Sequence, residues 1–222
     1  MITWMARNGW MGFPRLSVNS GLGGTFTLAY KLTDNPTETW TSRFIRFKVG
    51  QPQASVGGAR LFYEAFPALF DSFGLRGRDC VFVSALSSTE TVADRGRLIP
   101  HIAIELADLV GAHEAVGSIS KQRHGKIHNL YRADARDAEL DKAQYVSQRL
   151  PARNVFVLDD FVTRGGTLSK VAEAVHAANP GSAVYGVALA KTERVAWCSN
   201  PTNSHVPERW GKVWTDGEKE VR

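Results

Sequence analysis

Cysteine is nearly absent from this chain of 222 residues, which has only Cys80 and Cys198. Neither belongs to a CxxC pair or to a Cys/His quartet with zinc-ligand spacing, so we expect two reduced thiols and no disulfide framework. Apolar runs approaching the roughly 18 residues of a membrane helix are also missing. The start of the chain, MITWMARNGW, lacks the charged region, apolar stretch and cleavage site of a signal peptide. These absences predict a soluble, cytoplasmic protein with no membrane partner.

A strong excess of either charge is missing too. The chain has 27 basic and 22 acidic residues, a formal net charge of +5, together with 43% hydrophobic residues. This composition excludes a disordered, collagenous or low-complexity protein, and the length favours one domain with appendages. The mild basic excess suits either nucleic-acid binding or a pocket for a polyanionic small molecule, and only its location distinguishes them.

The N-terminal part combines β-type and helical patterns. Two runs rich in β-branched and aromatic residues, at 25–32 and 39–49, flank the polar stretch 33–38 and predict a β-hairpin. An apolar stripe that includes Leu61 and Leu69 predicts a helix that ends at Gly74. We therefore expect residues 1–77 to form a hairpin and helix extension, or hood.

From Cys80 onward, strand patterns alternate with helix patterns, which is typical of a parallel sheet covered on both faces. Strands are expected at 80–84, 115–119, 155–158 and 183–190, and helices at 98–109, 134–150 and 168–178. The fold class is therefore α/β, with a central, mainly parallel sheet in a core at 78–192 and a polar C-terminal tail at 193–222. Tryptophans near both ends, among them Trp40 and Trp214, predict that the ends pack together.

The most informative stretch is VFVLDDFVTRGGT, residues 155–167. An apolar strand precedes Asp159 and Asp160, so these carboxylates are expected at the strand end, where ligands of open α/β sheets bind. Gly165 and Gly166 permit a tight turn with inward N–H groups, and Thr167 is expected to cap the following helix. Inward N–H groups, hydroxyls and a helix N-terminus form an anion site, for which phosphate is the natural ligand.

The turn is not a Walker loop, because no Lys follows the glycines and the GxxxxGK[ST] spacing is absent. Carboxylates that bind a diol, beside a cradle for one phosphate, suit a ribose 5-phosphate.

The same stretch resembles the phosphoribosyl-diphosphate (PRPP) signature of the type I phosphoribosyltransferases. The resemblance implies a protein that transfers a phosphoribosyl group from PRPP, with Mg²⁺, to an unidentified acceptor with release of pyrophosphate. It implies that Asp159 and Asp160 hold the ribose hydroxyls and meet Mg²⁺ indirectly, through PRPP. It also implies a 5-phosphate cradle, formed by Thr163, Arg164, Gly165, Gly166 and Thr167.

Residues 78–192 further resemble the competence-protein-F-like members of this superfamily, in which a loop for pyrophosphate follows the first core strand. The corresponding loop here consists of Ser84, Ala85, Leu86, Ser87 and Ser88. An Arg-Gly pair follows at Arg95–Gly96, as in those relatives. Their four N-terminal zinc-ligand cysteines are missing, and the predicted hairpin stands in their place.

The segment KQRHGKIHNLYR, residues 121–132, is basic and contains no acid. Its position resembles that of the mobile loop that closes over pyrophosphate in the orotate branch, which implies catalytic roles for Arg123, His124 and Lys126. Cations are needed there because a leaving pyrophosphate develops charge. A solvated loop and a loop that contacts a nucleic-acid backbone are the alternatives.

Three functions therefore stay open: a transferase, a non-catalytic PRPP-sensing or regulatory module, and a competence-type accessory protein associated with DNA. A homodimer is also left open. Thr163 stands where the 6-oxopurine enzymes carry an acid, so we expect no hypoxanthine or guanine transfer. Carboxyl groups elsewhere that could replace this acid are those of Glu90, Asp94 and Glu193.

Overall fold

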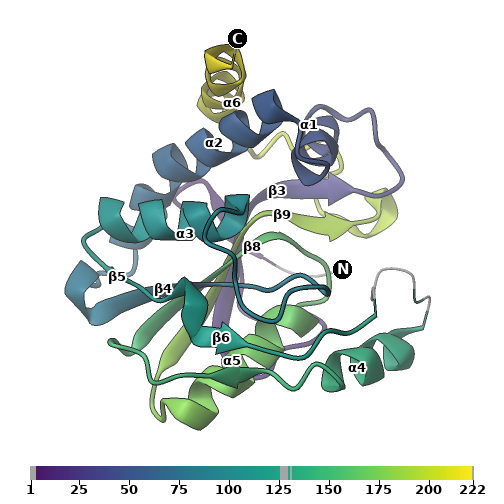
Figure 1. Ribbon diagram of the computed structural model, residues 1–222. Coiled ribbons are helices and arrows are strands. Elements are labelled where there is room, and N and C mark those ends of the chain that lie inside the picture. The colour runs from purple at the N-terminus through teal and green to yellow at the C-terminus, as the bar shows by residue number, and fades with distance from the viewer. Residues whose placement is uncertain (1–3, 126–129, 131, 222) are drawn as a thin grey trace.

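A computed structural model describes residues 4–125, 130 and 132–221 (Figure 1). Its centre is a seven-stranded sheet in the order β1-β2-β3-β9-β8-β4-β5, and β6 and β7 form a separate antiparallel pair. The strands are β1 (Met5–Arg7), β2 (Trp10–Phe13), β3 (Leu22–Leu32), β4 (Cys80–Ser84), β5 (His113–Glu114), β6 (Ile119–Ser120), β7 (Val146–Ser147), β8 (Asn154–Val162) and β9 (Ala183–Glu193). Within the large sheet, β3, β9, β8, β4 and β5 are parallel to one another, while β1 pairs antiparallel with β2 and β2 pairs antiparallel with β3. The predicted α/β class with a mainly parallel sheet is confirmed.

Helices cover both faces of this sheet (Figure 1). They are α1 (Thr39–Lys48), α2 (Pro52–Asp71), α3 (Leu98–Leu109), α4 (Ala133–Asp141), α5 (Gly166–Ala178) and α6 (Glu208–Glu220), with the 3-10 turns η1 (Gly77–Asp79), η2 (Val116–Ser118) and η4 (Val195–Trp197). Helices α1, α2, α3 and α6 belong to the core on one face. Helix α5 packs on the other face, and α4 contacts α5.

Strand burial explains why the core sequence is so apolar. Phe82 and Phe156 stack in register on the α2–α3 face, with ring centroids 5.2 Å apart, while Val81 and Val155 face α5. A parallel strand buried on both faces needs apolar residues at every position rather than at alternate ones.

The predicted hairpin at 25–49 is wrong. Its first run is β3, which pairs in parallel with β9 in the central sheet, and its second run is helix α1. Trp40, Phe44 and Phe47 recur with helical spacing and are buried, and the Glu38 carboxylate accepts a hydrogen bond of 2.7 Å from the Thr41 N–H. The β-type composition of this run is overridden by that cap and by the apolar stripe. The described part of the predicted N-terminal extension, from residue 4 on, therefore supplies β1, β2 and β3 to the central sheet.

Two further predictions differ from the structure. The expected helix at 134–150 ends at Asp141, and the chain then turns, with Gln144 at a left-handed φ of 47°, before β7. The expected strand at 115–119 is mainly the turn η2, with short strands on either side. The predicted helix at 98–109 is confirmed as α3.

The segment predicted as a polar C-terminal tail contains helix α6. Trp214 of α6 is buried against Trp40, with ring centroids 6.2 Å apart, and Trp4 donates a hydrogen bond of 2.7 Å to the Ser199 hydroxyl. The predicted packing of the two chain ends is thus confirmed. No helix in the described part of the chain is long and apolar enough to cross a membrane.

Candidate functional site

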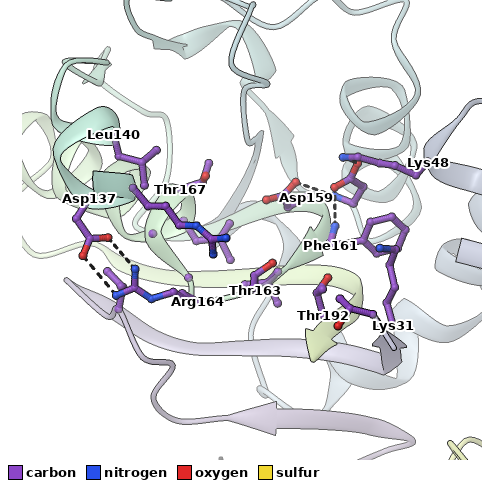
Figure 2. Close-up of a pocket in the computed structure, with 18 residues that line it drawn as sticks. Lys31, Lys48, Asp137, Leu140, Asp159, Phe161, Thr163, Arg164, Thr167 and Thr192 are labelled. Carbon is purple, nitrogen blue, oxygen red and sulfur yellow. Dashed lines mark hydrogen bonds and ion pairs between the residues drawn. The ribbon is translucent and has the colours of Figure 1, made fainter. Parts of the chain in front are cut away.

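A cavity of about 590 Å³ lies at the carboxyl ends of β3, β9 and β8, between α1 and α4 (Figure 2). The residues that line it are Val18, Lys31, Thr33, Lys48, Arg136, Asp137, Leu140, Asp159, Asp160, Phe161, Val162, Thr163, Arg164, Gly165, Gly166, Thr167, Leu168 and Thr192. All the residues predicted to bind the ribose and its 5-phosphate are therefore brought together in one cavity.

The two acids lie within β8 rather than after it, because β8 continues to Val162 alongside β9. The neighbouring strand β4 ends earlier, where Ser84 pairs with Leu158, so the acids extend past its end. The Asp160 N–H donates to the Asp159 carboxylate (2.8 Å), and the Asp160 carboxylate forms an ion pair with the Lys48 ammonium (Figure 2).

The surroundings of the Asp159 carboxyl disfavour its ionised form. Burial raises the pKa of Asp159 well above its ordinary value of 3.8, and the adjacent charge of Asp160 raises it further. The Lys48 ammonium offsets only part of this effect, because it pairs with Asp160. Asp159 is therefore costly to ionise in the free protein, and hydroxyl donors or a cation would relieve that cost.

The glycine turn creates an uncapped helix start. Gly165 has a φ of 89°, and a Cβ added there would lie 2.6 Å from the Val18 carbonyl oxygen, so only glycine fits. Gly165 is itself the N-cap, and the prediction that Thr167 caps the helix is wrong, because α5 already begins at Gly166. No side chain caps this helix within the described residues, and its first residues line the cavity. Their backbone N–H groups and the helix dipole favour an anion.

Arg164 points towards α4 instead of over the turn (Figure 2). Its guanidinium donates to both carboxylate oxygens of Asp137, at 3.1 and 3.3 Å, and to the Ala133 carbonyl at 3.3 Å. The Arg164 side chain thus fastens α4 to the turn. A second guanidinium, that of Arg136 on α4, also lines the cavity and donates a hydrogen bond of 2.5 Å to the Leu130 carbonyl.

The loop of Ser84, Ala85, Leu86, Ser87 and Ser88 does not line the cavity. Ser84 is fully buried, and its hydroxyl has no partner within the described residues. The Ser87 N–H donates to the Glu90 carboxylate (2.7 Å), which also pairs with Arg97 (2.7 Å). One backbone N–H of the loop that was predicted to meet pyrophosphate is therefore already paired with a carboxylate of this chain.

The basic segment lies beside this loop. The His124 N–H donates to the Ser88 carbonyl (3.2 Å), and the Lys121 N–H donates to the Thr91 carbonyl (2.9 Å). Arg123 is exposed, and neither it nor His124 lines the cavity. Lys126 lies outside the described residues. The two segments predicted to meet pyrophosphate are thus neighbours, and none of their described residues lines the cavity.

The candidate bases lie elsewhere. Glu90 accepts the Ser87 N–H and pairs with Arg97. Asp94 accepts the Gly96 N–H (2.9 Å). Glu193 pairs with Lys191 (3.0 Å). None of the three lines the cavity.

Several lining residues were missed from the sequence: Lys31 and Thr192 at the ends of β3 and β9, Lys48 of α1, and Arg136 of α4. Lys31 and Thr192 could have been found only if the sequence had shown that β9 pairs in parallel with β8 and that β3 pairs in parallel with β9, since carboxyl ends of parallel strands meet at one edge.

Magnesium fits this cavity only as an ion shared with a ligand. Within the described residues, no group of three or more His, Cys, Asp or Glu gathers around one point. Two adjacent carboxylates supply oxygen ligands of the type Mg²⁺ prefers, and the remaining ligands would come from phosphate oxygens and water.

Comparisons with protein-family models and with curated proteins gave no match for this chain.

Proposed function

We propose that the protein binds PRPP with Mg²⁺ and transfers its phosphoribosyl group to a nitrogen nucleophile. The observation that supports this most is one cavity that holds both a glycine turn without a side-chain cap at the start of α5 and a half-buried carboxyl pair. The turn suits a 5-phosphate, and the pair suits the two ribose hydroxyls.

In this proposal the chain acts by orientation and charge. Asp159 and Asp160 accept hydrogen bonds from the ribose hydroxyls, and the N–H groups of Gly166 and Thr167 hold the phosphate. Magnesium would neutralise charge on the diphosphate. The lone pair of the acceptor nitrogen forms a bond to the anomeric carbon as the bond from that carbon to diphosphate breaks. The electron pair of that bond leaves with diphosphate, and a proton carried by the nitrogen passes to solvent. Fixing both reactants is worth several orders of magnitude in rate.

The test measures PRPP binding by calorimetry with Mg²⁺ and pyrophosphate release with a panel of amine and heterocyclic acceptors. We expect wild type to bind PRPP, and the double variant Asp159→Asn with Asp160→Asn to lose binding while it stays folded. Asp216→Asn, on the exposed face of α6, is the matched control. Unchanged PRPP affinity in a folded double variant would refute the site.

A PRPP-sensing module is the second candidate, and one observation favours it. Glu90 already accepts the Ser87 N–H in the loop expected to bind pyrophosphate. A sensor would bind PRPP with the same cavity but release no pyrophosphate with any acceptor. Glu90→Gln separates the candidates: it should raise affinity for inorganic pyrophosphate if this loop serves the leaving group, and change nothing in a sensor.

A further inference from the structure

The end of the cavity farthest from the glycine turn holds two cationic side chains beside an aromatic ring. The ammonium groups of Lys31 and Lys48 lie 5.6 and 5.8 Å from the centroid of the Phe161 ring. These residues come from β3, α1 and β8, and all three line the cavity (Figure 2).

The charges at this end are unbalanced. Lys48 pairs with Asp160, but within the described residues Lys31 has no acceptor at hydrogen-bonding distance. Burial lowers the pKa of Lys31, and the neighbouring Lys48 lowers it further, whereas Asp160 opposes the shift. Two ammonium groups thus lie at this end of the cavity, and only that of Lys48 pairs with the Asp160 carboxylate. A half-buried cation without a partner is unfavourable, and an anion between the two lysines would relieve it.

Two aromatic side chains of α1 hold the Phe161 ring in place. Phe44 and Phe47 of α1 contact it edge-on, with centroids 5.5 and 6.2 Å away. Its half-buried ring supplies an apolar surface to the cavity. Such a fixed ring favours a planar or apolar body in its ligand.

We propose that Lys31, Lys48 and Phe161 form the acceptor subsite, and that the acceptor is a planar ring carrying a carboxylate or a similar anionic group. This inference rests on the proposed transferase function. The sheet order supports it: the loop after β4 lies on one side of the β8 acids, while β9 and β3, which carry Thr192 and Lys31, lie on the other. A nucleophile enters opposite its leaving group, so the acceptor belongs on the β3 side if diphosphate lies on the β4 side.

The test uses pairs of ring compounds that differ mainly in charge: benzoate against benzamide, and nicotinate against nicotinamide. Their binding is measured by ligand-observed NMR, with and without PRPP. We expect wild type to bind an acid at least about tenfold more tightly than its amide. Lys31→Met should abolish this preference and leave amide binding unchanged, while Lys31→Arg should retain it. Lys212→Met, an exposed lysine of α6, is the charge-matched control and should behave as wild type.

Two outcomes would overturn the acceptor assignment while the transferase proposal stands. One is equal binding of acids and amides, or no binding of either, by a wild-type protein that binds PRPP; the transferase proposal would then survive alone. The other is a loss of affinity for inorganic pyrophosphate in Lys31→Met with acid binding unchanged, which would assign these lysines to the leaving group. Acid binding without any PRPP binding would instead leave an anion site and refute both the transferase and the acceptor assignment.

Discussion

The Asp159 carboxyl shows how a single residue can be placed for a ligand at the expense of the free protein. It is half-buried beside a second carboxyl, that of Asp160, and the Lys48 ammonium pairs with Asp160 rather than with Asp159. Groups perturbed by burial and a like charge inside a cavity are typical of functional sites.

This placement predicts a pH-dependent stability. The pKa of Asp159 in the folded protein is raised above its unfolded value. The contribution of this carboxyl to the free energy of unfolding is therefore fully present below about pH 4 and is lost as the pH rises towards the raised folded pKa. Asp159→Asn removes that loss. We expect the free energies of unfolding of the variant and the wild type to differ less near pH 5 than near pH 8. Near pH 8 the variant should be more stable by about 1 kcal/mol or more, as measured by urea unfolding.

Asp160→Asn is the matched control. It breaks a partly exposed ion pair with Lys48, worth less than about 1 kcal/mol, and leaves Asp159 buried, so part of the pH dependence should persist. If Asp159→Asn and wild type lose stability in parallel from pH 5 to pH 8, Asp159 ionises normally.

At the scale of elements, the turn between β8 and α5 depends on one glycine. Gly165→Ala must adopt a left-handed φ and also meet the Val18 carbonyl at 2.6 Å, whereas Gly50→Ala adopts a similar φ of 72° with nothing within 4 Å. We expect Gly50→Ala to cost about 1 kcal/mol, and Gly165→Ala about 2 to 4 kcal/mol. Urea unfolding measures both.

Gly165→Ala should also weaken binding of inorganic phosphate, while Gly50→Ala should not. Equal costs for the two variants would show that the turn tolerates a Cβ and that the approach to Val18 is not tight.

The basic segment gives a second prediction at this scale. If Arg123 meets pyrophosphate only as charge develops, Arg123→Ala should lower turnover by about a hundredfold and PRPP affinity by less than about threefold. Arg76→Ala, an exposed arginine paired with Asp79, is the control. Equal losses of turnover and affinity, or a loss of affinity for DNA alone, would favour a sensor or a DNA-associated role.

The sequence predicted elements best where local signals agree. The apolar run before Asp159 and the glycines after it place β8 and the turn almost correctly, because both depend on adjacent residues. The run at 39–49 was misassigned because β-type composition outweighed the helical spacing of Trp40, Phe44 and Phe47. Lys31 could not be assigned to the site, because the β3–β9 pairing joins segments about 160 residues apart.

On the scale of the whole molecule, one aromatic cluster joins the C-terminal helix to the cavity wall. Trp214 of α6 packs against Trp40, Phe44 and Phe47 of α1, and the last two contact Phe161 in the cavity. Helix α6 also approaches α2 closely, since a Cβ on Gly57 would lie 2.9 Å from Trp214. The position of α1, and with it Lys48, thus depends on a helix far along the chain.

The last prediction follows from this linkage. Trp214 is fully buried, so Trp214→Ala should cost about 3 to 5 kcal/mol of folding free energy. Trp197→Ala removes an indole that is 64% exposed and should change stability by less than about 0.5 kcal/mol. Under conditions where both variants are folded, PRPP affinity should fall in Trp214→Ala alone, because α1 loses the packing that sets Lys48 and Phe161 against the acids. Unaltered affinity in a destabilised Trp214→Ala would show that the cavity wall is held without α6, by the packing of α1 on β3 and α2.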